Sequence, residues 1–236
     1  MRQTEWRRIG GFRVVGYWRP SAFAPPPSAP ASLPSRIASI TGVLLILGGI
    51  MAVGIALLTQ RHAPQPSAAA AGAIGPGHHG PWLRRSTPES LAIPSIGVYT
   101  NVLHLGRATD GSIQVPSLDT QAEEAAWYKY SVTPGQIGAS VIEGHVDTYQ
   151  GPAVFFRLGA LRPGDLVDVN LADGTTAVFR VTGVREYLKS RFPAGTIFGA
   201  TDYAALRLIT CGGAFDYATG HYLSSTVVFA SLISQR

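Results

Sequence analysis

Two residues of this sequence have side chains suited to nucleophilic chemistry. Cys211 follows the apolar run LRLIT and precedes two glycines, which leave backbone room for a substrate to approach closely. His145 stands in the run VIEGHVDT. A neutral imidazole near a thiol accepts its proton, or the two form a thiolate–imidazolium pair, and either arrangement activates sulfur. The two residues therefore indicate a cysteine nucleophile with a histidine partner.

Other groups compete for these roles. His221 is closer to Cys211 in the sequence and is the main alternative base. Glu143, His145 and Asp147 alternate, as metal ligands on one strand face would, but one histidine with two carboxylates is a weak metal signal. We expect no metal and no cofactor. Asp147 is interpreted as a loop residue near the site, where it orients the imidazole.

The residues after Pro88 have the two-residue alternation of β-strands. In the run DLVDVNL, apolar and polar residues alternate, and an Asp-Gly hairpin signal follows at Asp173. Strands are expected at Ser90–Ile93, Thr100–Leu105, Ala139–His145, Asp165–Leu171, 177–182, Tyr203–Cys211 and Thr226–Ile233, with a short helix at Ala153–Leu161. Seven or eight strands predict an all-β domain, either a closed barrel or a sandwich. His104, within one apolar strand, is interpreted as structural.

A membrane anchor is expected before this domain. Residues 37–59 form 23 residues without a charge, enough for a helix to cross a bilayer. Five arginines precede Arg36, so the positive-inside rule places the N-terminus in the cytoplasm and the later residues outside. A cleaved signal peptide is the alternative, but this apolar run is longer than a signal peptide requires.

Charge and composition support this division of the chain. The net charge is +5, yet residues 1–85 carry nine arginines and one glutamate, while the remainder is net acidic. A basic groove for nucleic acid is therefore not expected. We divide the chain into a basic, Pro-rich cytoplasmic tail (1–36), a transmembrane helix (37–59), an extracytoplasmic linker that acts as a spacer (60–85) and the β-rich domain (86–236).

The order of motifs resembles the sortase family. GHVDT around His145, LITC at Leu208–Cys211 and the late run TVVFA are similar to sortase motifs. The runs PGQIGASVIEGHVDT, GPAVFFRLGALRPGD and LRLITCGGAFD, followed by GHY, resemble class F, the actinobacterial group. The resemblance covers about Ser90 to Leu232. It implies a closed eight-stranded sortase-type β-barrel with short helices, preceded by the transmembrane helix.

The resemblance also implies a reaction. Cys211 would attack an LPxTG-like sorting motif between Thr and Gly and form a thioester, while His145 would protonate the departing amine. An amine acceptor, such as a peptidoglycan precursor, would then receive the acyl group. The implied partners are secreted proteins with a C-terminal sorting signal, the amine acceptor and the lipid bilayer, without nucleic acid.

One departure from the sortase pattern concerns a positive charge. Sortases carry an arginine on the strand after the cysteine, where it stabilises the oxyanion, but here the only arginine after Cys211 is Arg236, the last residue. Arg191, in the loop before the cysteine strand, and the backbone amide of Gly212 are the candidate replacements. Arg207 lies four residues from Cys211, about 13 Å along a strand, which is too far for contact unless the chain bends.

Two alternative functions remain open, and the missing arginine supports the first of them. The chain would be a degenerate sortase-like domain that binds peptide with little or no catalysis. In the second alternative, the chain is another cell-wall enzyme that pairs a cysteine with a histidine, of the L,D-transpeptidase class. Those enzymes tend to carry an arginine shortly after a Gly-Cys pair. Here Thr210 precedes the cysteine.

Overall fold

A computed structural model describes residues 45–51, 62–75 and 80–236 of the chain. It divides into two units, residues 1–59 and 60–236. Residues 45–51, within the expected membrane span, are helical, and the rest of that span lies outside the described residues. No helix among the described residues is both long and apolar enough to span a bilayer. The transmembrane anchor therefore stays a prediction.

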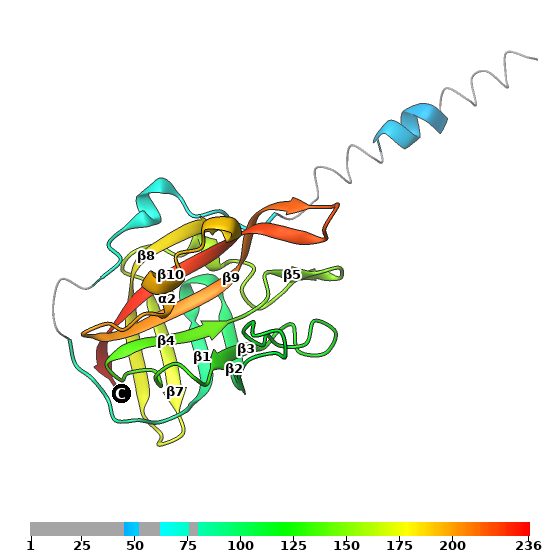
Figure 1. The fold of residues 1–236 in the computed structure, drawn as a ribbon. Coiled ribbons are helices and arrows are strands. Elements are labelled where there is room, and N and C mark those ends of the chain that lie inside the picture. Colours follow the sequence, from blue (N-terminus) through cyan, green and yellow to red (C-terminus); the bar gives the residue numbers. More distant parts are fainter. Residues whose placement is uncertain (1–44, 52–61, 76–79) are drawn as a thin grey trace, which may run out of the picture. The chain divides into compact units, whose positions relative to one another are not determined.

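The second unit is built around a closed barrel of eight strands (Figure 1). Around the barrel the strands follow the order β1, β2, β3, β4, β9, β10, β8 and β7. Their bounds are β1 Pro88–Ile93, β2 Val98–Leu105, β3 Ala125–Tyr128, β4 Gly138–Glu143, β7 Leu166–Leu171, β8 Thr176–Leu188, β9 Ala204–Asp216 and β10 His221–Gln235. The resemblance implied this architecture, and the closed barrel is confirmed; a sandwich is excluded.

Short elements connect these strands. A separate two-stranded sheet joins β5 (Asp147–Thr148) to β6 (Gly151–Pro152). One α-helix, α2 (Ala194–Phe198), lies between β8 and β9. The 3₁₀ turns are η1 Ala68–Ala71, η2 Pro94–Ile96, η3 Leu158–Ala160 and η4 Lys189–Arg191. The helix expected at 153–161 is therefore only a 3₁₀ turn at its end.

Alternation along the strands separates two apolar clusters. Leu206 and Leu208 of β9 belong to a large inner cluster that fills the barrel. Ile209, one residue on, belongs to a second group, here called the outer cluster, which packs under α2. Its members are Tyr128, Val141, Ile197, Ile209, Val227 and Phe229. Both faces of β9 are thus covered by apolar side chains up to Ile209. This packing fixes the face of the sheet on which each of the following side chains lies.

The residues expected to form a spacer pack against the barrel where they are described. Arg185 of β8 donates hydrogen bonds to the carbonyl oxygens of Ala71 and Gly72, at 3.0 and 2.9 Å. Ala70 is 2% exposed and belongs to the inner cluster. Residues 62–75 therefore differ from the expected spacer, because the small residues of the run fit closely against β8.

Candidate active site

Strand register brings Cys211 and His145 together. Strands β4 and β9 run parallel with Glu143 opposite Ile209, and the N–H of Gly144 donates to the Ile209 carbonyl oxygen at 3.1 Å. Each candidate residue follows its member of that pair by two positions. Neighbouring strands lie about 4.8 Å apart. The sequence-predicted pair thus lies at one end of the barrel, each residue two positions beyond the last paired residues of β4 and β9.

Cys211 lies within a strand rather than at its end. β9 continues to Asp216, paired along its length with β10, and Cys211 is opposite Ser225. The pairing with β4 ends at Glu143, so β9 has lost one neighbour at the cysteine. The expectation of a strand end was wrong, because the two glycines continue the strand. Cys211 is half-buried and on the same face as Ile209 of the outer cluster.

The two glycines have packing roles of their own. A Cβ on Gly212 would lie 2.6 Å from the Thr226 hydroxyl oxygen, on the inner side of the sheet. Gly213 has a φ of +72°, and the register of β9 with β10 shifts between Tyr222 and Ser224 nearby. Glycine is the residue that adopts this conformation without strain, as at a bulge. Gly212 is buried and paired with Ser224, so its glycine is explained by packing as well as by the oxyanion role expected for it.

His145 lies just beyond β4, not within it, and its ring is held by a backbone carbonyl. Its Nε2 is 2.6 Å from the carbonyl oxygen of Pro116. A carbonyl oxygen only accepts, so Nε2 carries the hydrogen and donates it. The preceding Gly144 is buried, and a Cβ there would lie 2.7 Å from Phe155 Cδ2 and Val154 Cγ1. The ring position is therefore fixed on two sides.

Tyr222 and Asp147 join the hairpin of β9 and β10 to the β5–β6 sheet. The Tyr222 hydroxyl donates a short hydrogen bond to the Asp147 carboxylate. Burial, this hydrogen bond and the nearby Asp147 and Cys211 raise the pKa of Tyr222 above its ordinary value. Figure 1 shows the hairpin and the β5–β6 sheet extending from the same end of the barrel. Asp147 is near the site as expected, but its hydrogen-bond partner is Tyr222, which the sequence analysis missed.

The alternative base, His221, lies further along the hairpin. It is exposed and paired with Asp216, five residues beyond Cys211 on β9. Five residues of strand span roughly 16 Å. The geometry therefore favours His145 as the partner of the thiol.

The positive charge beside the thiol comes from Lys189. Its Nζ lies 3.5 Å from Cys211 Sγ. Arg191, the expected candidate, belongs to the same 3₁₀ turn and is exposed, yet in the described part of the chain the contact with sulfur is made by Lys189. Arg207 is 1% exposed and lies over the Phe229 ring at 4.7 Å, so it stays in the outer face of the barrel.

Glu143 adds an ionisable group next to the site. It is the last residue of β4, and burial raises the pKa of its carboxyl to about 7. A carboxyl of this kind is neutral in mildly acidic solution. No group of three or more His, Cys, Asp or Glu side chains in the described residues is arranged to hold a metal ion.

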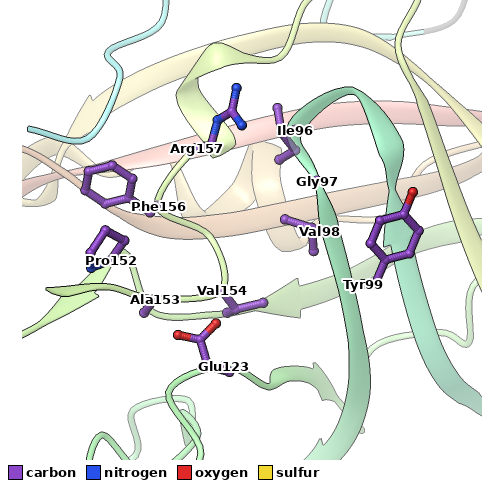
Figure 2. Close-up of a pocket in the computed structure, with 10 residues that line it drawn as sticks. All are labelled: Ile96, Gly97, Val98, Tyr99, Glu123, Pro152, Ala153, Val154, Phe156 and Arg157. Carbon is purple, nitrogen blue, oxygen red and sulfur yellow. The ribbon is translucent and has the colours of Figure 1, made fainter. Parts of the chain in front are cut away.

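A separate pocket of about 380 Å³ lies between the β1–β2 turn and the segment after β6 (Figure 2). Glu123 and Arg157 are its charged residues, and Figure 2 shows them at different sides of the opening. Neither Cys211 nor His145 lines it. The adjacent Phe155 donates its N–H to the His145 carbonyl oxygen at 2.9 Å, which links the pocket wall to the site by backbone alone.

This arrangement is suited to acyl transfer. It combines a half-buried thiol, an imidazole that follows the neighbouring strand at the same end of the barrel, an ammonium group in contact with sulfur and an apolar outer cluster. A thiol activated in this way attacks carbonyl carbons, and the neighbouring imidazole exchanges protons with the leaving and attacking groups.

Comparisons with known proteins agree with this description. A sortase-domain family model matches residues 91–233. Sortase A from Corynebacterium diphtheriae is 20% identical with a TM-score of 0.47, and the match covers 64% of this chain and 62% of that one. The chain thus spans less than two thirds of that relative. Sortase A of Listeria monocytogenes is 18% identical with a TM-score of 0.47, covering 64% of this chain and 90% of that one.

A further structural match is the SrtA sortase from Actinomyces oris, at 22% identity and a TM-score of 0.47, covering 73% of this chain and 90% of that one. No curated protein sequence matches the chain. The sortase-domain match includes both Cys211 and His145 and extends over more than half of the chain. The chain therefore belongs to the sortase family, whose members are generally cysteine transpeptidases.

Proposed function

We propose that this protein is a membrane-anchored class F sortase that cleaves an LPxTG-like sorting motif and joins the released protein to a cell-wall amine. The observation that supports the proposal is the parallel register of β4 and β9, which ends two residues before both His145 and Cys211. The class is supported by the runs GHVDT and LITCGG and by GHY at 220–222. The anchor is supported by the uncharged run at 37–59 and the arginines before it.

Acylation is the first half of the reaction. The Cys211 thiolate attacks the carbonyl carbon of the Thr–Gly bond, and the carbonyl oxygen takes up the negative charge. The C–N bond then breaks, and the departing Gly amine takes a proton from the His145 imidazolium. The carbonyl re-forms as a thioester. Since Nε2–H is engaged by Pro116, this proton exchange falls to Nδ1.

Deacylation reverses these roles. The acceptor amine attacks the thioester carbon and gives its proton to neutral His145, while the Cys211 thiolate leaves. One amide bond has replaced another, so no oxidant and no external energy source is needed. Water in place of the amine gives simple hydrolysis.

The direct test uses the full-length protein in detergent micelles with a panel of LPxTG-like peptides, with and without an added amine. Mass spectrometry is expected to show a thioester on the wild-type protein and a new amide product when the amine is present. Cys211→Ala should abolish both while leaving the thermal unfolding temperature nearly unchanged. A product formed by Cys211→Ala would contradict the proposal.

A sortase-like domain that binds peptides with little turnover is the second candidate. The observation in its favour is the uncharged stretch Leu223–Ser224–Ser225 on β10, the strand next to the cysteine. The same panel separates the two functions, because a binding domain would retain peptide without forming a thioester.

A further inference from the structure

We infer that Lys189 is a catalytic residue, whose ammonium group pairs with the negative charge first on the Cys211 sulfur and then on the substrate oxyanion. The inference rests on the proposed function for the second of these roles. It starts from the contact between Lys189 Nζ and Cys211 Sγ at 3.5 Å. No carboxylate forms an ion pair with Lys189 within the described residues, so sulfur is the partner that the ammonium group has there.

Strand register explains why this lysine reaches the thiol. β10 lies between β8 and β9, with Ser225 opposite both Tyr187 of β8 and Cys211 of β9. Residues in register share a face, so Tyr187 is on the side of the thiol. The 3₁₀ turn η4 begins two residues later at Lys189, whose side chain reaches the sulfur. The two outer strands are about 10 Å apart, and the long lysine side chain spans this gap.

The backbone of Lys189 is held by aromatic packing on both sides. Tyr187 and Phe192 are partly buried against the outer cluster, and their rings meet edge to face at 6.3 Å. Lys189 opens the 3₁₀ turn between them. The aromatic residues on both sides of the turn therefore pack against the outer cluster. That cluster also contains Ile209, two residues before the nucleophile.

The other charged groups around the thiol leave this role to Lys189. Asp147 accepts a hydrogen bond from Tyr222. The Glu186 carboxylate lies near Gly213, where a Cβ would be 3.0 Å from Oε1. The central strand contributes Leu223, Ser224 and Ser225, which carry no charge. Lysine is also rare here, at two of nineteen basic residues, so arginine is the ordinary cation of this chain and Lys189 departs from it.

The chemical role follows from where the charge moves. A thiolate is the reactive form of cysteine, and a neighbouring ammonium group stabilises it. When sulfur bonds to the carbonyl carbon, the negative charge passes to the carbonyl oxygen, one bond further out. A flexible lysine can follow that displacement, and one donor to an oxyanion is worth about 10²–10³ in rate.

The test begins with a readout that needs no peptide. Cys211 is the only cysteine, so alkylation of the full-length protein by iodoacetamide at neutral pH is read directly by mass. Lys189→Met is expected to slow alkylation by about tenfold, and Lys189→Arg to keep it within about threefold of wild type, because a cation stabilises the thiolate. Arg191→Met is the matched control, since it removes a charge from the same turn without touching sulfur.

The second readout is the rate of thioester formation with an LPxTG-like peptide. Lys189→Met is expected to lower this rate by about 10²-fold, as for a lost oxyanion donor. Adding Leu223→Arg to Lys189→Met should restore part of it, because Leu223 lies two residues before Ser225, the cross-strand neighbour of Cys211. Thermal unfolding of each variant checks the fold.

Two results would overturn the inference: alkylation of Lys189→Met at the wild-type rate, or an equal loss in Arg191→Met. A failure of the proposed function would give a different pattern of results from a failure of this inference. Alkylation would still depend on Lys189, but no peptide of the panel would acylate the wild-type protein.

Discussion

The barrel contains two parallel strand pairs; one includes a histidine, and a histidine follows the other closely. In β2–β3, His104 is in register with Trp127, and in β4–β9, His145 follows the register that leads to Cys211. Both imidazoles place Nε2 2.6 Å from a proline carbonyl oxygen, Pro88 and Pro116 respectively. The hydrogen bond is the same, so it does not distinguish a structural histidine from a reactive one. The groups around each imidazole distinguish the two histidines.

The surroundings of His104 show what a structural role requires. Its ring meets the buried Trp127 edge to face at 5.4 Å. The indole nitrogen in turn donates to Ser131 Oγ and the Val132 carbonyl oxygen. This histidine is surrounded by groups that do not react. His145 instead follows the strand register that leads to Cys211, whose sulfur contacts Lys189, and it comes two residues after Glu143, whose carboxyl pKa is raised.

Removing each imidazole tests this comparison most strongly. His145→Ala is expected to lower the rate of product formation by about 10²–10⁴, the usual worth of general acid–base catalysis. His104→Ala is expected to leave that rate within about twofold, because it removes only the packing against Trp127 and the hydrogen bond to the Pro88 carbonyl oxygen, and to lower stability by about 1–2 kcal/mol. Kinetics and urea unfolding measure the two effects. An inactive His104→Ala with a normal unfolding midpoint would break the distinction.

Glu143 sharpens the comparison through pH. Its carboxyl stays protonated in the folded protein up to about pH 7. The unfolded chain ionises from its ordinary value of 4.5. The folded state therefore binds more protons between these values, and stability falls as pH rises, by up to about 3 kcal/mol. Glu143→Gln lacks the titrating carboxyl, so this dependence of stability on pH should be absent in that variant.

The measurement is the free energy of unfolding in urea at several pH values from 4.5 to 8. The wild-type protein should lose stability over this range more steeply than Glu143→Gln, and the two curves should run parallel above pH 7. Identical slopes in both proteins would mean that Glu143 is not protonated in the folded state.

Gly144 tests how closely the imidazole position depends on packing. A methyl group there would meet Phe155 and Val154 at 2.7 Å, so Gly144→Ala forces the segment before His145 to shift. We expect a loss of about 1–3 kcal/mol in stability and a lower rate of product formation. Gly195→Ala is the matched control, because its Cβ would meet no atom within 4 Å. Equal effects of the two substitutions would contradict the packing argument.

The smallest expected effect is that of Tyr222→Phe. It removes the hydroxyl that donates to Asp147 and leaves the ring, which packs on Phe215 at 5.0 Å. A hydrogen bond to a charged acceptor contributes about 1.5–3 kcal/mol, and partial exposure of the pair reduces that to about 1 kcal/mol. Chemical unfolding should detect the change. A stability equal to wild type would show that the link between the β9–β10 hairpin and the β5–β6 sheet contributes nothing to the free energy of unfolding.

The sequence was sufficient to find most of the barrel strands, though not all of their bounds. β7 was expected close to its observed bounds, because one of its faces meets the barrel interior. β8 and β10 were expected at 177–182 and Thr226–Ile233, but they extend to Thr176–Leu188 and His221–Gln235. β3 was missed, since all four of its residues are buried and no alternation marks it. The glycines after Cys211 were interpreted as a strand end, although the strand continues through them.

The candidate site was predictable only in part for a geometric reason. Cys211 and His145 occupy motifs that can be read along the chain. The Lys189 contact depends on three neighbouring strands, β8, β10 and β9, and on a register that no local pattern contains. Arg191 was preferred because arginine was expected. Membrane anchoring and class F membership stay predictions.

The docking of residues 62–75 also limits how far the active site can travel. Pro64 lies against Gly159 of η3, so a chain held in a bilayer by residues 37–59, as proposed, has at most five residue steps from Thr59 to a contact with the folded unit. Fully extended, that tether reaches roughly 18 Å, whereas a free spacer up to residue 85 would reach about 90 Å. With the proposed anchor, a tether this short would keep the active site within a thin layer above the membrane. Substrates held in the same layer would meet it at a correspondingly higher effective concentration.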